Sequence, residues 1–214
     1  MNDAEIKRQL ADISEELYHN GVVTATGGNL SVRSCERECA LWITPSALFK
    51  GNLTPGDMTL IDLDGKVLAG KYPPSIEFAF HAGLMRSRPD VNAIVHSHPV
   101  YATVWGLGDL DIPPITYDAL IVGSFPYIPW HMVGSLELAS AVIDSAGRDG
   151  IWGVFMRNHG LVTLGRDLRQ AADNTLMTEH TLKILHLAHQ MSIKPDELDD
   201  DSIEELKHLA ETRT

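Results

Sequence analysis

The 214-residue sequence has only two cysteines, no long apolar run and few basic residues. Cys35 and Cys39 are too few for a disulfide framework, so we expect incidental, reduced thiols, with a hairpin disulfide or half of a metal site as alternatives. No apolar stretch approaches the roughly 20 residues that cross a bilayer. The start, MNDAEIKRQLADISEEL, lacks the apolar centre and cleavage site of a signal peptide. These absences predict a cytoplasmic protein.

The shortage of basic residues excludes one large class of partners. Lysine and arginine number 17 against 29 aspartates and glutamates, which gives a formal net charge of −12. Nucleic-acid binding draws most of its affinity from clustered basic residues on phosphates, so we expect no nucleic-acid partner and no membrane partner. A small anionic substrate stays compatible, because a metal ion and a few backbone N–H groups can reverse the potential locally.

The length and the pattern of segments predict one domain. A chain of this size can bury roughly 70% of its unfolded surface, and we find no internal repeat and no linker. We expect a single domain over residues 1–214, with the charged segment 195–214 as a loose or disordered C-terminal tail. Helices mingle with strands and a hairpin, which indicates a layered α/β or α+β fold with a largely antiparallel sheet.

Hydrophobic periodicity and turn residues predict the individual elements. Helices are predicted over 3–19, 75–87, 101–107, 135–145 and 167–191. Strands are predicted after the turn at 24–28 and over 41–44, 58–63, 66–69, 93–98 and 152–157. Within this set, Gly21 is suited to a left-handed cap after the first helix, Asp64-Gly65 predicts a hairpin turn, and Ser75 is a plausible N-cap.

Three histidines carry the clearest chemical signal. His96 and His98 lie two apart at the end of a predicted strand, where side chains share a face about 7 Å apart, and two imidazoles can converge on one metal ion. Pro99 ends that strand. His159 follows another apolar strand and precedes Gly160, which allows close backbone approach. For each histidine, a structural role is the alternative.

Two further segments carry weaker signals. Glu77 and His81 lie four apart on one face of a predicted helix, so Glu77 could be a fourth metal ligand or a general base, with a surface glutamate in the first turn as the alternative. The turn Thr26–Asn29 offers backbone N–H groups and could cradle an anion, although it is neither a Walker loop nor a dinucleotide fingerprint.

Taken together and in this order, these features resemble the class II aldolase/adducin-head family, which includes L-fuculose-1-phosphate aldolase and L-ribulose-5-phosphate 4-epimerase. The matching segments, closest to the aldolase branch, are GGNLSVR at 27–33, ITPSALFKGNLTPGDM at 43–58, PPSIEFAFH at 73–81, AIVHSHPVYAT at 93–103, IPPITY at 112–117 and RNHGLVTLG at 157–165. The resemblance implies a three-layer α-β-α sandwich around a largely antiparallel central sheet. It also implies a homotetramer with active sites at subunit boundaries.

The resemblance assigns roles to individual residues. Positions matching His96, His98 and His159 bind zinc, although manganese, iron and cobalt also accept imidazole. Glu77 matches the residue that completes the resting metal site and serves as base, and Tyr117 matches the tyrosine that protonates the aldehyde oxygen. Residues corresponding to the phosphate pocket are Gly28, Asn29, Thr44, Ser46 and Ser75.

Two departures put phosphate recognition in doubt. Ile76 stands where the aldolases often carry a hydroxyl before the glutamate, and Ala47 stands where they often carry glycine. The substrate could instead carry a carboxylate or an aromatic ring. Side chains that could line such a pocket, with core packing as their alternative role, are Trp105, Tyr127, Trp130 and His131.

The resemblance leaves several activities open. We expect first a metal-dependent aldolase that cleaves a phosphorylated ketose through an enolate or enediolate. A metal-dependent decarboxylase of a hydroxyaromatic or β-keto acid is the alternative. A 4-epimerase is less favoured, because that branch carries aspartate at the position of Glu77. A non-catalytic adducin-like module is disfavoured by the retained histidines, Glu77 and Tyr117. Dehydratase chemistry also occurs in the family.

Overall fold

The molecule is organised around one eight-stranded sheet. A computed structural model describes residues 1–123 and 125–212. The strand order is β4-β3-β2-β1-β5-β8-β7-β6, and every neighbouring pair is antiparallel except β6 with β7. The strands are β1 Asn29–Arg33, β2 Ala40–Ile43, β3 Thr59–Asp62, β4 Val67–Ala69, β5 Ala93–Ser97, β6 Tyr127–Ile128, β7 Gly153–Met156 and β8 Gly160–Gly165.

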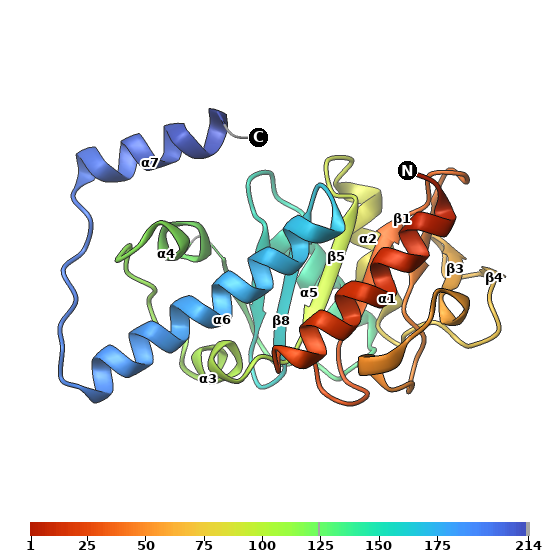
Figure 1. The fold of residues 1–214 in the computed structure, drawn as a ribbon, viewed down its shortest axis with the longest axis horizontal. Helices are drawn as coiled ribbons and strands as arrows, with labels where there is room; N and C mark the ends of the chain where they lie inside the picture. The colour runs from red at the N-terminus through yellow and green to blue at the C-terminus, as the bar shows by residue number, and fades with distance from the viewer. Residues whose placement is uncertain (124, 213–214) are drawn as a thin grey trace.

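Helices cover both faces of this sheet (Figure 1). The helices are α1 Asp3–His19, α2 Phe78–Ser87, α3 Val100–Gly108, α4 Tyr117–Val122, α5 Leu136–Ala146, α6 Leu168–Gln190 and α7 Asp200–Thr212, with short 3-10 turns η1 Lys50–Asn52 and η2 Pro55–Asp57. One buried cluster joins α1 and α6 to one face of the sheet, and a second joins α2 and α5 to the other. A third cluster packs α3 and α4 against the later part of α6. The predicted three-layer sandwich is therefore confirmed.

The first helix shows how local sequence sets its limits. Asn2 and Glu5 form a reciprocal capping box at its start, and Gly21 follows its end with φ +72°. Ile6 and Leu10 lie on its buried face. The predicted helix over 3–19 and its glycine cap are confirmed.

The predicted hairpin is also confirmed. β3 and β4 pair antiparallel with a register shift between Leu60 and Ile61, and Gly65 occupies the turn with φ +86°. Glycine adopts this backbone conformation without the steric cost that a β-carbon brings. The remaining predicted strands and the helices at 101–107, 135–145 and 167–191 have counterparts whose ends differ by a few residues.

The predicted helix over 75–87 begins too early. The helix starts at Phe78, and Glu77 is its N-cap rather than a residue in its first turn. Pro74 forms an isolated bridge with Pro45, and the Ser75 hydroxyl accepts the N–H of Glu77. These contacts hold residues 74–77 out of the helix and direct Glu77 inward. Ser75 is therefore not the N-cap.

The structure differs from the sequence-based expectation at two other places. Met191, the last residue of the predicted helix over 167–191, is the C-cap of α6 and is 70% exposed. The central strand β8 was not predicted. All six of its residues are buried, so it lacks the alternation of apolar and polar residues that indicates a half-buried strand.

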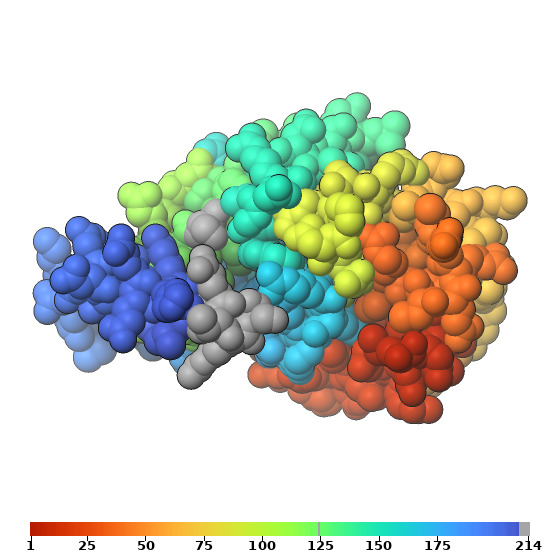
Figure 2. Space-filling view, turned by 90° about the horizontal axis from the view of Figure 1, so that it is seen from above, coloured from red at the N-terminus to blue at the C-terminus, as the bar shows by residue number. Residues whose placement is uncertain are grey.

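The C-terminal segment forms helix α7, which an extended stretch joins to the end of α6 (Figure 1). In the space-filling view of Figure 2, this helix lies at one end of the molecule and the N-terminal region at the other. Residues 213 and 214 of the expected tail lie outside the described residues. No described helix combines the length and the apolar character that crossing a membrane would require. Cys35 and Cys39 are free and exposed.

Arg88 ties the end of α2 to the loop after α5. Its guanidinium is 1% exposed, and its Nε and Nη2 donate to Asp90. Its Nη1 donates to three backbone carbonyls, those of Ala146, Arg148 and Ile151. We predict that Arg88→Met lowers the free energy of unfolding by about 3 kcal/mol, because buried carbonyls lose their donor. Urea unfolding measures this change.

Arg86 provides the matched control. It is exposed and pairs with Asp64 at the surface, so Arg86→Met should change the free energy of unfolding by less than about 1 kcal/mol. Equal losses in the two variants would contradict the structural role of Arg88.

Candidate active site

The position of His96 follows from strand alternation in β5. Ile94 belongs to the cluster on the α2 and α5 side of the sheet, and His96 shares that face because it lies two residues further on. His96 is fully buried, and its ring meets the ring of Phe80 edge-on. His98 follows directly after the end of β5, where the chain leaves the sheet.

The hairpin between β7 and β8 brings in His159. Met156 pairs with Gly160, so a three-residue loop carries His159, and Asn158 in that loop adopts φ +55°. Gly160 is needed for close approach, because a β-carbon there would lie 2.3 Å from the backbone oxygen of Ser97. The close pairing of β5 with β8 therefore sets His159 beside the end of β5.

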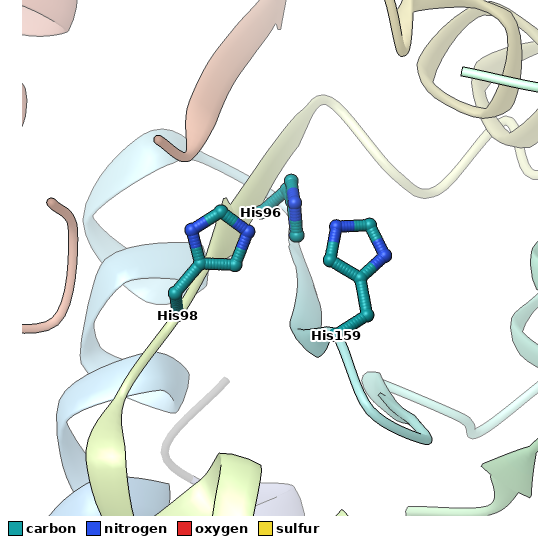
Figure 3. A group of neighbouring side chains, drawn as sticks. All are labelled: His96, His98 and His159. Carbon is teal, nitrogen blue, oxygen red and sulfur yellow. The ribbon is translucent and has the colours of Figure 1, made fainter. Parts of the chain in front are cut away.

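The three imidazoles form one group (Figure 3). Ring centroids are 4.6 Å apart for His96 and His98, 4.8 Å for His96 and His159, and 5.3 Å for His98 and His159. One nitrogen from each ring lies within 4.8 Å of the other two. Nitrogens bound to one zinc ion lie roughly 3–4 Å apart, since each bond is about 2 Å long. The observed spacing is close to that requirement.

The unpartnered atoms of the cluster fit a cation. His96 Nδ1 lies 3.0 Å from the carbonyl oxygen of Leu161, which accepts its proton and leaves Nε2 for the site. Among the described residues, His96 Nε2 and Glu77 Oε1 are buried at this point without hydrogen-bond partners. His159 turns Nε2, rather than its unpartnered Nδ1, toward Glu77. Buried polar atoms are usually satisfied, so this concentration of lone partners at one point is suited to a metal ion.

Glu77 faces the same point. Its carboxylate is 5% exposed, with Oε2 3.2 Å from His96 Nε2 and Oε1 3.5 Å from His159 Nε2. The structure therefore brings together all four residues that the sequence predicted as metal ligands.

A buried chain of hydrogen bonds orients Glu77. The amide of Asn29 donates from Nδ2 to Glu77 Oε2 at 2.9 Å. Asn29 Oδ1 accepts from His81 Nε2 at 2.5 Å, and His81 Nδ1 lies 2.7 Å from Ser31 Oγ, which donates to it. This tautomer of His81 fixes the direction of the Asn29 amide, and the amide in turn fixes one oxygen of Glu77. The other carboxylate oxygen, Oε1, accepts no hydrogen bond from the described residues.

The electrostatics keep the Glu77 carboxylate ionised and two of the three clustered imidazole rings neutral. Burial acts to raise the pKa of Glu77, but the attraction of His96 and His159 and the bond from Asn29 hold that pKa well below its usual range. Burial lowers the pKa of His98 to about 3 and that of His159 to about 4, and His96 adds to both shifts. Burial also opposes a charge on His96, yet Glu77 raises its pKa. Neutral imidazole is the form that binds metal.

A cavity of about 340 Å³ opens beside these residues. Its volume suits a small substrate. Its lining residues are Thr26, Gly27, Gly28, Asn29, Pro45, Ser46, Ala47, Lys50, Ser75, Ile76, Glu77, His98, Val133 and His159. The wall thus combines Glu77, His98 and His159 with the two turns at 26–29 and 45–47.

The residues predicted for the phosphate pocket fall into two groups. Gly28, Asn29, Ser46 and Ser75 line the cavity. Thr44 lies behind it, fully buried, and its hydroxyl accepts the N–H of Leu30. Both polar atoms of the Asn29 side chain already form hydrogen bonds, Nδ2 with Glu77 and Oδ1 with His81.

Tyr117 lies far from the histidines of its own chain. It begins α4, is 36% exposed, and lines a different cavity together with Trp152 and Arg166. Arg166 follows the last residue of β8, whereas His159 precedes the first, and six strand residues span roughly 20 Å. Tyr117 therefore cannot reach the cluster within one chain.

The aromatic residues considered for a substrate pocket also lie outside this cavity. Trp105 is buried in the α3 cluster, and Tyr127 stacks on Phe155 and donates to the Leu110 carbonyl. Trp130 is 51% exposed. His131 is partly exposed and is not among the lining residues either.

Sequence reasoning missed Lys50 and Val133 as lining residues and Ser31 as the end of the hydrogen-bond chain. A lysine in a loop gives no periodic signal, so the sequence alone could not indicate that its side chain is buried.

Comparison with known proteins gives one matching family model. The model described as "Class II Aldolase and Adducin N-terminal domain" matches residues 8–186. An L-fuculose phosphate aldolase of Methanococcus maripaludis is 32% identical over 176 residues, which cover 82% of this chain and 93% of that protein. A 3-oxo-tetronate 4-phosphate decarboxylase of Haemophilus influenzae is 31% identical over 214 residues, with 97% and 99% covered.

Solved structures give the same picture. The structure of an L-fuculose 1-phosphate aldolase superposes with a TM-score of 0.86 at 27% identity. The match covers 97% of this chain and 96% of that one, so the shared fold extends over nearly the whole length.

The histidine cluster generates a direct prediction. His98→Ala should lower bound zinc from about one ion per chain to a small fraction, because two imidazoles bind far more weakly than three. Elemental analysis after loading and desalting measures the metal, and circular dichroism checks the fold. His131→Ala, outside the cluster, is the matched control and should keep its metal. Full zinc content in folded His98→Ala would remove His98 from the ligand set.

Proposed function

This chain belongs to the family of class II aldolases and adducin N-terminal domains, and from that membership we propose that it is a metal-dependent carbon–carbon lyase. The family contains enzymes named as aldolases, decarboxylases and epimerases. The observation that carries the proposal is the convergence of three imidazoles and Glu77 on one point at the wall of a small cavity.

In this proposal His96, His98 and His159 hold one divalent cation, with Glu77 as a further ligand before substrate binds. Zinc is our choice, and manganese, iron and cobalt accept the same donors. When bound, the cation supplies positive charge that stabilises the negative charge developing on a carbonyl oxygen as the neighbouring bond breaks. Neutral imidazole ligands leave that positive charge undiminished, which is typical of a catalytic site.

Glu77 moves the proton at carbon. Its carboxylate is ionised, held at Oε2 by Asn29 and free of protein hydrogen bonds at Oε1 among the described residues. After the bond breaks, the carbon that keeps the electron pair needs a proton, and in the reverse direction it must lose one. A fixed carboxylate at the cavity wall is suited to this exchange.

Tyr117 exchanges the proton at the aldehyde oxygen. Because it lies beyond reach within one chain, the proposal requires a neighbouring subunit to supply it. We therefore propose a cytoplasmic homotetramer in which α4 of one subunit completes the cavity of the next. The partial exposure of Tyr117 is compatible with such a contact.

The first candidate reaction is aldol cleavage of a phosphorylated ketose, such as L-fuculose 1-phosphate or a relative, to dihydroxyacetone phosphate and an aldehyde. The second candidate is decarboxylation of a β-keto or hydroxyaromatic acid. Decarboxylation is supported as a candidate by the similarity to the Haemophilus influenzae decarboxylase, which extends over 97% of this chain. Both reactions leave an electron pair beside a carbonyl, so the same residues serve either.

Two other activities have less support. The presence of Glu77, where the epimerase branch carries aspartate, disfavours a 4-epimerase. The assembled cluster disfavours a non-catalytic adducin-like module, because such a module has no need of converging metal ligands.

The reaction can be tested at Glu77. In heavy water, the zinc-loaded protein should exchange a carbon-bound hydrogen of dihydroxyacetone phosphate, and Glu77→Gln should exchange it at least about 100-fold more slowly, because the amide cannot take the proton. Nuclear magnetic resonance follows the exchange. The three histidines remain, so the variant should keep its fold and its metal.

Two results would redirect the proposal. Carbon dioxide release from a β-keto or hydroxyaromatic acid, without exchange on dihydroxyacetone phosphate, would replace the aldolase by the decarboxylase. Exchange at the wild-type rate in Glu77→Gln would assign the base to another residue.

The subunit arrangement can be tested by complementation. Tyr117→Phe and Glu77→Gln should each be nearly inactive alone, while equal amounts dissociated and reassembled together should regain activity. If each site draws Glu77 from one subunit and Tyr117 from the next, roughly a quarter of the sites in random tetramers carry both native residues. Mixed assemblies no more active than the separate variants would contradict a shared site.

A further inference from the structure

His98 lies in the short connection between the end of β5 at Ser97 and the start of α3 at Val100. Its backbone N–H donates to the carbonyl oxygen of Val22 at 2.9 Å. Its ring packs directly against Gly27, where a β-carbon would lie 2.7 Å from His98 Nδ1. These contacts hold His98 on one side. The path of the chain after His98 therefore depends on what holds the start of α3.

The start of α3 has no cap of its own. An α-helix leaves its first backbone N–H groups without partners inside the helix, and the N-cap residue here is Pro99, which makes no side-chain capping bond. Glu179 of α6 replaces that cap. Its Oε2 accepts the N–H groups of Tyr101 and Ala102, each at 3.0 Å, and its Oε1 accepts the N–H of Tyr101 at 3.1 Å.

The charge of Glu179 is directed to this helix end. No ion pair in the described part of the chain includes Glu179. A carboxylate is favoured at a helix N-terminus, because the aligned peptide dipoles place positive partial charge there. The carboxylate therefore meets the start of α3 with both its hydrogen-bond acceptors and its charge.

Glu179 stands on a helix that is fixed to the sheet. The hydroxyl of Thr175 on α6 lies 2.7 Å from that of Thr163 on β8, and both are buried. Glu179 lies one helical turn beyond Thr175, so the two side chains share a face of α6. β8 is also the strand that follows His159. The start of α3 and the loop that carries His159 are thus held by the same pair of elements.

We propose that Glu179 is a positioning residue of the metal site. Two residues, Pro99 and Val100, separate His98 from the capped N–H groups, so a shift of the helix start displaces the imidazole. Metal ligands must be held within about 0.5 Å of their binding geometry. Glu179 acts through the backbone of α3 rather than by contact with the metal. This inference rests on the proposed function, because it takes His98 as a metal ligand.

The zinc affinity tests this role. In competition with a chromophoric chelator, Glu179→Met should raise the Kd for zinc about 10-fold or more, because the imidazole loses its support. Glu179→Gln keeps a carbonyl oxygen for the same N–H groups, so its Kd should stay within about threefold of the wild-type value. Asp173→Asn is the matched control. It removes an exposed carboxylate of the same helix that pairs with Arg169, and its Kd should not change.

The spectrum of the cobalt-loaded protein separates positioning from a purely structural cap. The visible absorption of bound cobalt reports the geometry of its ligands. Glu179→Met should change the positions and intensities of these bands, and Glu179→Gln should leave them as in the wild-type protein. A purely structural cap would lower the resistance to urea and alter neither the spectrum nor the Kd.

We expect Glu179→Met to fold, because the ring of Tyr101 still contacts that of His186 and keeps α3 against α6. If it does not fold, Glu179→Asp carries the same two measurements. Its carboxylate is one carbon shorter and reaches the N–H groups less well, so the Kd should rise and the bands should change there too.

The outcomes separate this inference from the proposed function. A wild-type Kd and spectrum in folded Glu179→Met, with metal lost in His98→Ala, would overturn the role of Glu179 alone. Equal losses in Glu179→Gln and Glu179→Met would overturn the assignment to these hydrogen bonds. A wild-type protein that binds no zinc would overturn both proposals. A raised Kd that glutamine restores would uphold Glu179 even if dihydroxyacetone phosphate showed no exchange.

Discussion

The antiparallel pairing of β5 with β8 is the constraint on which the site depends. It sets His96 opposite Val162 and brings the loop before Gly160 against the end of β5. A β-carbon at Gly160 would collide with the backbone of Ser97, so two strands distant in sequence approach closely only because of this glycine. Both strands are buried on both faces, which gives the imidazoles a rigid base.

Around that base, the fold balances a buried carboxylate against buried imidazoles. Glu77 would be costly alone in an apolar interior, yet it lies between His96 and His159 and accepts from Asn29. The chain of hydrogen bonds through His81 to Ser31 uses both ring nitrogens of a fully buried histidine. Such networks favour one geometry, because each member is satisfied only when its neighbours are in place. One carboxylate oxygen is left toward the cavity.

Much of this arrangement could be predicted from the sequence. The spacing of His96 and His98 and the glycine after His159 offered the three histidines as candidate ligands, and the family resemblance joined them in one metal site. The spacing of Glu77 and His81 offered Glu77 as a ligand or a base, and the resemblance assigned it both roles. The start of α2 could not be predicted correctly, because a bridge between Pro74 and the distant Pro45 helps to decide where the helix begins. Three other features depend on tertiary packing, which no local pattern encodes. They are the burial of Lys50, the hydrogen bond from Asn29 to Glu77 and the distance of Tyr117 from the cluster.

The central claim is that imidazoles from two separate chain segments, residues 96–98 and the loop between β7 and β8, bind one metal ion. X-ray absorption spectroscopy of the zinc-loaded protein tests it most directly. The account predicts one ion per chain with a first shell of nitrogen and oxygen atoms at about 2.0–2.1 Å and the outer-shell scattering of three imidazole rings. A protein that holds no stoichiometric metal, or a metal shell without imidazole scattering, would contradict it.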